Sequence, residues 1–302
     1  MEAENGTTSQ GDHQQQASTD PIPVNLTGAG KTQTEDGGKK VAIHGGLPWF
    51  LGKQPRELHL ARYSLAPMFT AADFELYQGR FQADPEWNGR RLDIRRRLQA
   101  LGEEVKSSYG ALGVDLERRE SLHHPHATNR KRVRRQRTML FRGKKLRKQL
   151  KSFLGRELGK DLDSAVNNLH LQIGLDESGA YWGLRLDSGA WYDLNVLLKR
   201  AEQEPGRKAL AESCGKAPDF RFVVDGKGGR PFEQMNSRDW RDLAGILRPG
   251  ESRLEIVQRM TPDQVVAAGE DFGPGVVADL ERLADFYQLA CWNLDSPSGA
   301  SL

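Results

Sequence analysis

Acidic residues are missing from one long stretch of this sequence. No Asp or Glu occurs between Ser121 and Arg156, a window that contains 13 Lys and Arg residues. The whole chain of 302 residues has 44 Lys and Arg against 41 Asp and Glu, a net charge of +3. Subtracting the 13 cations of the window from this +3 leaves −10 on the remaining residues. This segregation of charge is the main functional signal in the sequence.

Long apolar runs are also absent. None approaches the roughly 20 residues that a membrane-spanning helix needs, so no membrane partner is expected. The N-terminus "MEAENGTTSQGDHQQQ" lacks the basic start and apolar core of a secretory signal. The chain has only two cysteines, Cys214 and Cys291, and their spacing is not that of a metal site. These absences together predict a cytoplasmic protein with two ordinary thiols.

The sequence lacks the common catalytic signatures. It contains no GxSxG elbow, no kinase motif set, no dinucleotide-binding glycine fingerprint and no paired-carboxylate motif. No segment implies a cofactor, and none is expected. Whether the protein is an enzyme is therefore uncertain from the sequence.

Composition divides the chain into a tail and a folded region. Residues 1–40 are rich in Gly, Thr, Ser, Gln and Asp and poor in large apolar side chains. Such a segment buries too little surface to offset its ordering entropy, so we predict a disordered polar tail. Residues 41–295 are expected to form a single α+β domain that includes a basic strand–helix segment at 121–156. Residues 296–302 are expected to form a flexible C-terminus.

Periodicity predicts how strands and helices alternate. The segment "NLHLQIGL" places apolar residues at every second position, and with the turn "DESG" it predicts an antiparallel hairpin over 168–186. Ile94, Leu98, Leu101 and Val105 form one stripe of an amphipathic helix. One long helix is expected over 275–292. Because hairpins and helices follow each other unevenly, we predict an α+β fold, a mainly antiparallel sheet with flanking helices.

The basic window itself has a pattern of ordered elements. "RQRTMLFR" (135–142) is typical of a strand, and "KKLRKQLKSFLGRELG" (144–159) is typical of a helix with a leucine stripe. Its cations are therefore expected on ordered elements, which favours a shaped binding face over a loose arm. The outward face of this helix is expected to carry Lys144, Lys145, Arg147, Lys148 and Lys151.

Several short segments carry a distant resemblance to a known family. They are "FTAADF" (69–74), "LG" (101–102), "HA" (126–127), "HLQIGL" (170–175) and "FYQLACW" (286–292). In order and spacing the chain resembles the YktB-like family of uncharacterised bacterial α+β proteins over about 69–292. The basic strand–helix is larger and more basic than the segment of that family, and the N-terminal tail is extra. The resemblance implies the fold and a bacterial origin and no particular activity.

The charge pattern points first to a nucleic acid or another polyanion as the partner. Lys and Arg displace counterions from phosphates without sequence specificity, and Tyr181, Trp182, Trp191 and Tyr192 offer possible stacking surfaces. The alternatives are a solvated basic face, aromatic residues that belong to the core, and an acidic protein partner. The predicted nucleic-acid-binding residues are Arg130, Lys131, Arg132, Arg134, Arg135, Arg137, Arg142, Lys144, Lys145, Arg147, Lys148 and Lys151.

A rival hypothesis is an enzyme that acts on a phosphorylated substrate. His170 shares one face of its predicted strand with Gln172, His126 precedes the basic strand, and Asp193 follows an aromatic pair. A histidine, a carboxylate and nearby arginines suit general acid–base chemistry on a phosphoester. The alternative, which the sequence favours, is that His170 and Gln172 are ordinary polar residues on a half-exposed sheet.

Three histidines in one short segment are weak candidates for a metal site. His123, His124 and His126 surround Pro125, and clustered imidazoles suit zinc or similar metals. However, the window supplies no carboxylate, and its arginines oppose a divalent cation. We therefore expect no metal and interpret this segment as a polar turn.

Overall fold

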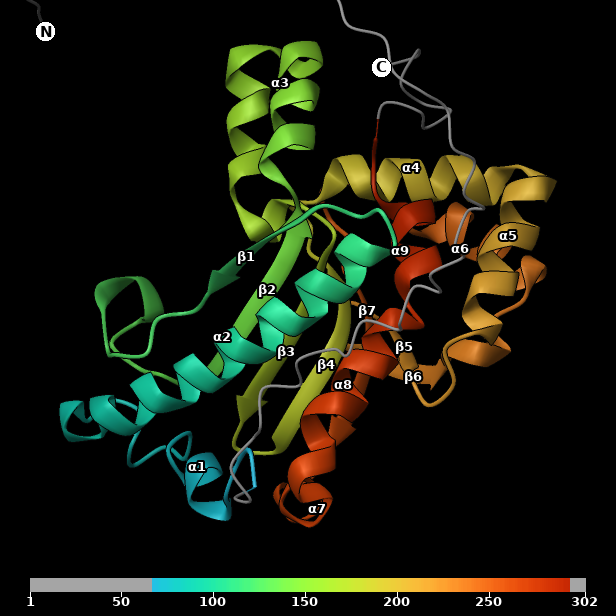
Figure 1. Ribbon diagram of the computed structural model, residues 1–302. Helices are drawn as coiled ribbons and strands as arrows, with labels where there is room; N and C mark the ends of the chain where they lie inside the picture. The colour runs from blue at the N-terminus through green and yellow to red at the C-terminus, as the bar shows by residue number, and fades with distance from the viewer. Residues whose placement is uncertain (1–66, 294–302) are drawn as a thin grey trace, which may run out of the picture. The chain divides into compact units, whose positions relative to one another are not determined.

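The computed structural model describes residues 67–293 (Figure 1). The tail predicted at 1–40, the domain start near 41 and the end at 296–302 lie outside the described residues. The strands are β1 (Leu116–Glu120), β2 (Arg135–Arg142), β3 (His170–Asp176), β4 (Gly179–Leu186), β5 (Arg221–Val224), β6 (Lys227–Pro231) and β7 (Leu254–Met260). The helices are α1 (Ala71–Glu75), α2 (Asn88–Ala111), α3 (Lys144–Gly159), α4 (Trp191–Glu202), α5 (Glu204–Gly215), α6 (Ser237–Ile246), α7 (Pro262–Ala268), α8 (Phe272–Glu281) and α9 (Ala284–Ala290).

The strands of the described region form one antiparallel sheet. Their order is β1-β2-β3-β4-β7-β5-β6, and each neighbouring pair is antiparallel. The first four strands are neighbours in both sequence and space, whereas β7 lies between β4 and β5. The chain therefore leaves the sheet after β4, adds helices and the β5–β6 hairpin, and returns as β7. This arrangement confirms the predicted α+β fold with a mainly antiparallel sheet.

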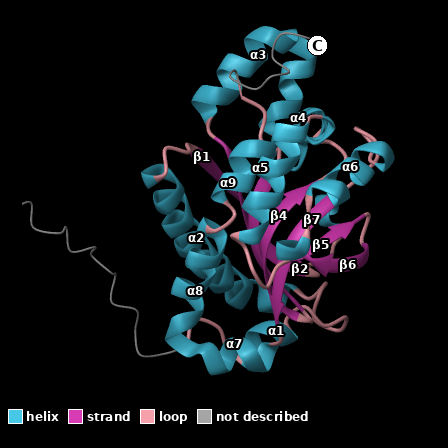
Figure 2. Cartoon of the chain, turned by 90° about the vertical axis from the view of Figure 1, so that its right-hand side faces the viewer, coloured by secondary structure: helices cyan, strands magenta, loops and turns pink. Residues whose placement is uncertain are grey.

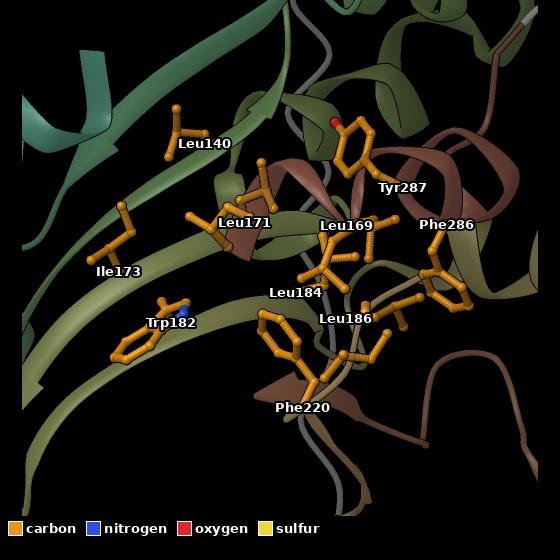
Figure 3. Close-up of a cluster of buried hydrophobic side chains, with 14 of the residues drawn as sticks. Leu140, Leu169, Leu171, Ile173, Trp182, Leu184, Leu186, Phe220, Phe286 and Tyr287 are labelled. Atoms are coloured by element: carbon orange, nitrogen blue, oxygen red, sulfur yellow. The ribbon is translucent and has the colours of Figure 1, made fainter. Parts of the chain in front are cut away.

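The alternating pattern of the β3–β4 hairpin sets which side chains enter the core. Leu171 pairs with Leu184 and Ile173 pairs with Trp182, so these four side chains share one face of the sheet. All four are buried in the main hydrophobic cluster, which also contains Tyr287 of α9 (Figure 3). Register is specified strongly here, because a slip of one residue moves the whole apolar set to the opposite face.

The long helices cover the same face of the sheet. Leu98 of α2, Leu197 of α4 and Leu280 of α8 are buried in one cluster with Leu140 of β2 and Ile256 of β7. Figure 2 shows α2 and α8 along one side of the strands. The first part of α3 instead continues beyond the end of β2 and packs on α4 in a smaller cluster with Leu150 and Val196 (Figures 1 and 2). In the described part of the chain, no helix is long and apolar enough to cross a membrane.

Several helix starts follow local capping rules. Thr70 and Asp73 form a capping box at the start of α1. The side chain of Asn236 accepts hydrogen bonds at the start of α6, and that of Thr261 does so at the start of α7. Each cap depends only on residues two or three positions apart, so its pattern is local in the sequence.

Two predicted helices differ from the structure, and two elements were not predicted. The single helix expected over 275–292 is two helices, α8 and α9, although Val276, Leu280 and Tyr287 along it are all buried. The predicted helix at 144–159 is broken at Gly155, whose φ of 75° lies outside the helical region. Strand β1 and helix α5 were not anticipated, since neither has a clear apolar period.

Candidate nucleic-acid interface

The structure divides the exposed cations of the basic window into two groups. The first, here the loop cluster, consists of Arg130, Lys131, Arg132, Arg134 and Arg135, all exposed. The second, here the helix cluster, consists of Lys144, Lys145 and Lys148 on α3, also exposed. The two clusters lie at opposite ends of β2, which separates them by its eight residues, a rise of roughly 25 Å. They are therefore two surfaces of the same sign and not one continuous stripe.

A compact set of hydrogen bonds builds the loop that carries the first cluster. The Asn129 side chain accepts from the backbone N–H of His126 and donates to the carbonyl of His124, both at 2.8 Å. The backbone N–H of Lys131 donates to the His126 carbonyl at 2.8 Å. Arg130 and Lys131 adopt positive φ angles of 57° and 55°, which are uncommon for residues other than glycine. The loop thus holds two consecutive basic residues in a costly backbone conformation.

The loop is also fixed to the rest of the domain. Val133 is buried, and its backbone N–H donates to the carbonyl of Gln82 at 2.8 Å. Gln136, buried at the start of β2, accepts from the Tyr77 hydroxyl at 3.0 Å and donates to the Arg91 carbonyl at 2.9 Å. Exposed cations alternate with these buried anchors, so the cluster projects from an ordered base.

Neither cluster is neutralised by the protein itself. Within residues 67–293, no carboxylate lies at ion-pair distance from any cation of the loop cluster or the helix cluster. Other arginines are paired: Arg118 contacts Glu103 at 2.9 Å, and Arg259 contacts Asp176 at 3.2 Å. The loop and helix clusters therefore leave positive charge available to a partner.

Three of the predicted binding cations already pair with carboxylates of the protein, two of them in its interior. Arg142 is 1% exposed and forms an ion pair with Asp193. Arg147, expected on the outward face of α3, is 5% exposed and contacts Glu117 of β1. Lys151 contacts Asp163 at 2.6 Å. We leave these three out of the interface, because their charged groups already have carboxylate partners. Arg137 is left out as well, since it is half-buried and donates to Gln172 at 3.0 Å.

The aromatic residues considered for stacking belong mostly to the core. Tyr181, Trp182 and Tyr192 are buried, and Trp191 is half-buried against the Tyr192 ring with centroids 3.4 Å apart. Tyr192 also stacks on Trp292. The structure therefore supports the alternative that these rings belong to the core. The candidate interface depends on its charges and not on stacking.

The residues of the enzyme hypothesis are not brought together. His170 pairs with Phe141 near the end of β2, whereas the loop that carries His126 precedes Arg135, which pairs with Asp176 six residues along β3. Six residues of strand span roughly 20 Å. The Asp193 carboxylate is already occupied, since it accepts from the backbone N–H groups of Leu169 at 2.6 Å and Trp292 at 2.8 Å as well as pairing with Arg142.

His170 is more buried than the sequence suggested. It is 0% exposed and Gln172 is 2% exposed, so the expectation of ordinary polar residues on a half-exposed sheet was wrong. Burial lowers the pKa of His170 to about 4, with the nearby Arg137 acting in the same direction. The imidazole is therefore neutral at neutral pH.

The three histidines of the loop stack edge to face. The ring centroids of His123 and His124 are 4.8 Å apart, and those of His124 and His126 are 5.9 Å apart. His123 Nδ1 lies 3.3 Å from the guanidinium of Arg95. Among the residues that the structure describes, no group of three or more His, Cys, Asp or Glu side chains is arranged to hold a metal ion.

Comparison of the chain with models of known protein families finds no match. A comparison with curated proteins finds none either. The resemblance to the YktB-like family therefore stays a prediction.

Proposed function

We propose that the protein binds nucleic acid through the loop cluster, by contacts to backbone phosphates. The observation that carries this proposal is the set of five exposed cations without a carboxylate partner, held on an ordered loop. Four of the five are arginines, whose planar guanidinium groups suit two-point contacts to phosphate oxygens. Because the rings considered for stacking are mostly buried, binding depends on the phosphates and not on the bases.

Counterion release gives the expected salt dependence. Each phosphate neutralised on a duplex contributes a slope of about −0.9 to the logarithm of affinity against the logarithm of salt concentration. Five contacts give a slope of about −4.5, so tripling the salt from about 50 to about 150 mM lowers affinity roughly 100-fold. Fluorescence anisotropy of the full chain with labelled duplex DNA and single-stranded RNA measures this slope.

Two variants of equal charge locate the binding surface. Replacement of Arg132, Arg134 and Arg135 by Gln removes three contacts of the loop cluster and is expected to reduce the slope by about 2.7. The matched control replaces Lys144, Lys145 and Lys148 of the helix cluster by Gln. It removes the same charge from the other end of β2 and is expected to leave the slope nearly unchanged.

Two results would contradict the proposal. The first is absence of binding by the wild-type protein at low salt. The second is an equal loss in both variants, which would show that affinity follows net charge and not the loop. If the wild-type protein binds no nucleic acid yet captures an acidic protein in the presence of nuclease, the basic loop serves a protein partner instead.

A further inference from the structure

The face of the sheet opposite the long helices carries a group of four polar side chains. Arg137 of β2 lies across Gly174 of β3 from Tyr181 of β4. The guanidinium Nη1 of Arg137 donates to Oε1 of Gln172 at 3.0 Å. His170 is two residues before Gln172 on the same strand, so its side chain shares this face. We call Arg137, His170, Gln172 and Tyr181 the polar cluster.

Two glycines, Gly174 and Gly183, lie beneath the side chains of the polar cluster. A Cβ at Gly174 would lie 2.5 Å from the hydroxyl and ring of Tyr181, so that ring lies directly over the glycine and extends toward β2. Gly183 pairs with Gln172 and lies between Tyr181 and Arg185 on β4. No side chain therefore stands between those two residues on this face.

The cluster contains a positive charge that contacts no carboxylate directly. Arg185 pairs with Asp187 at 2.8 Å and with Glu255, and Asp187 also acts electrostatically on Arg137. Arg137 has no ion-pair partner within the described residues, and its side-chain hydrogen bond goes to a neutral amide. Burial lowers the pKa of the Arg137 guanidinium, which reflects the cost of holding this charge away from water. An anion beside Arg137 would remove that cost.

Two buried polar atoms of the cluster also lack partners. The Tyr181 hydroxyl and Nε2 of His170 make no hydrogen bond, although Tyr181 is 3% exposed and His170 is 0% exposed. Buried polar groups usually have hydrogen-bond partners, so both atoms are available to a ligand. Nδ1 of His170 lies 2.9 Å from the Asn168 carbonyl, which can only accept, so Nδ1 carries the proton. Nε2 is therefore an acceptor that needs a donor.

These requirements define one kind of ligand. We propose that the polar cluster binds a small oxyanion that retains a hydroxyl group, such as hydrogen phosphate or a short hydroxycarboxylate. Its charged oxygens would accept from Arg137 and from the Tyr181 hydroxyl. Its own O–H would donate to Nε2 of His170. This site is separate from the loop cluster and does not depend on nucleic-acid binding.

Calorimetric titration of the full chain at neutral pH tests the ligand class. Inorganic phosphate and lactate represent the two sources of a hydroxyl-bearing oxyanion, and at least one is expected to bind saturably at one site. Sulfate matches phosphate in shape but has no proton to donate at this pH. It is expected to bind roughly tenfold more weakly than phosphate, the equivalent of one hydrogen bond.

The variant Tyr181→Phe tests the site and controls for folding. It removes an unpartnered hydroxyl, so the stability of the ligand-free protein is expected to stay level or rise. Anion affinity is expected to fall roughly tenfold, because a donor to the ligand is lost. Arg230→Gln, on the distant edge strand β6 and paired with Asp239 at 2.6 Å, is the matched control and is expected to keep wild-type affinity. No saturable binding of phosphate or lactate, or equal affinity of wild type and Tyr181→Phe, would overturn the proposal.

Discussion

Replacement of Asp193 by Ala is expected to lower the free energy of unfolding by about 3–5 kcal/mol, the usual cost of breaking a buried ion pair. Asp193 is 0% exposed and pairs with Arg142, which is 1% exposed. Arg142 also donates to the Trp292 carbonyl at 2.8 Å. Burial alone would lower the pKa of Arg142, but Asp193 outweighs this and raises it. Without the carboxylate, the guanidinium stays buried and uncompensated. Urea unfolding of the full chain measures the change in midpoint.

A double variant separates the charge from the loss of packing. Arg142→Met together with Asp193→Leu removes both charges and keeps apolar volume, so it is expected to be more stable than Asp193→Ala alone. Lys216→Met, at an exposed pair with Asp285, is a surface comparison expected to cost about 1 kcal/mol or less. A cost of Asp193→Ala no greater than that of Lys216→Met would contradict the structural role assigned to the buried pair.

Acidification is expected to destabilise the protein through His170. Its folded-state pKa of about 4 lies below the ordinary value of 6.5, so the unfolded chain binds a proton between these values that the folded protein does not. The contribution of His170 to the free energy of unfolding is fully present above about pH 6.5 and is lost as the pH falls toward about 4. The total is on the order of 3 kcal/mol, from the difference between the two pKa values. Its charged neighbours are Arg137, Arg185 and Asp187.

Carboxylates also titrate in this pH range, so the contribution of His170 is measured by comparing the free energy of unfolding of the wild-type protein with that of a variant. The variant His170→Gln cannot take up the proton, so the free energy of unfolding of wild type minus variant is expected to fall as the pH drops from 6.5 to 4. His126→Gln, on the exposed loop, is the control and is expected to run parallel to wild type. A constant difference between wild type and His170→Gln across this range would show that burial does not perturb the imidazole.

Local patterns in the sequence determined much of the secondary structure. The capping box of Thr70 and Asp73 is encoded locally, because its partners are three residues apart. The β3–β4 hairpin formed where strict alternation and a short turn coincide. The position of the break between α8 and α9 was not predicted, because the apolar stripe continues across it in the sequence.

The exposure of each cation was decided by tertiary structure. A period of two places Arg135 and Arg137 on one face of β2 and Arg142 on the other, but the sequence does not say which face meets the helices. Arg142 is buried because Asp193, 51 residues away in the sequence, forms an ion pair with it. Arg147 is buried because it pairs with Glu117 of β1. The sequence did not show this partner, because β1 has no apolar period that would predict a strand.

The two proposed sites differ in how far the sequence alone reveals them. An acid-free run of cations is visible in the sequence, so the loop cluster was part of the predicted interface from its composition alone. The polar cluster is not visible there, because Arg137, His170 and Tyr181 are ordinary residues in their own strands. Only the register of β2, β3 and β4 places Arg137 and Tyr181 beside Gly174 and puts His170 on the same face, and only the fold buries their polar atoms. Long-range pairing and solvent exclusion are properties of the folded chain, which no local pattern encodes.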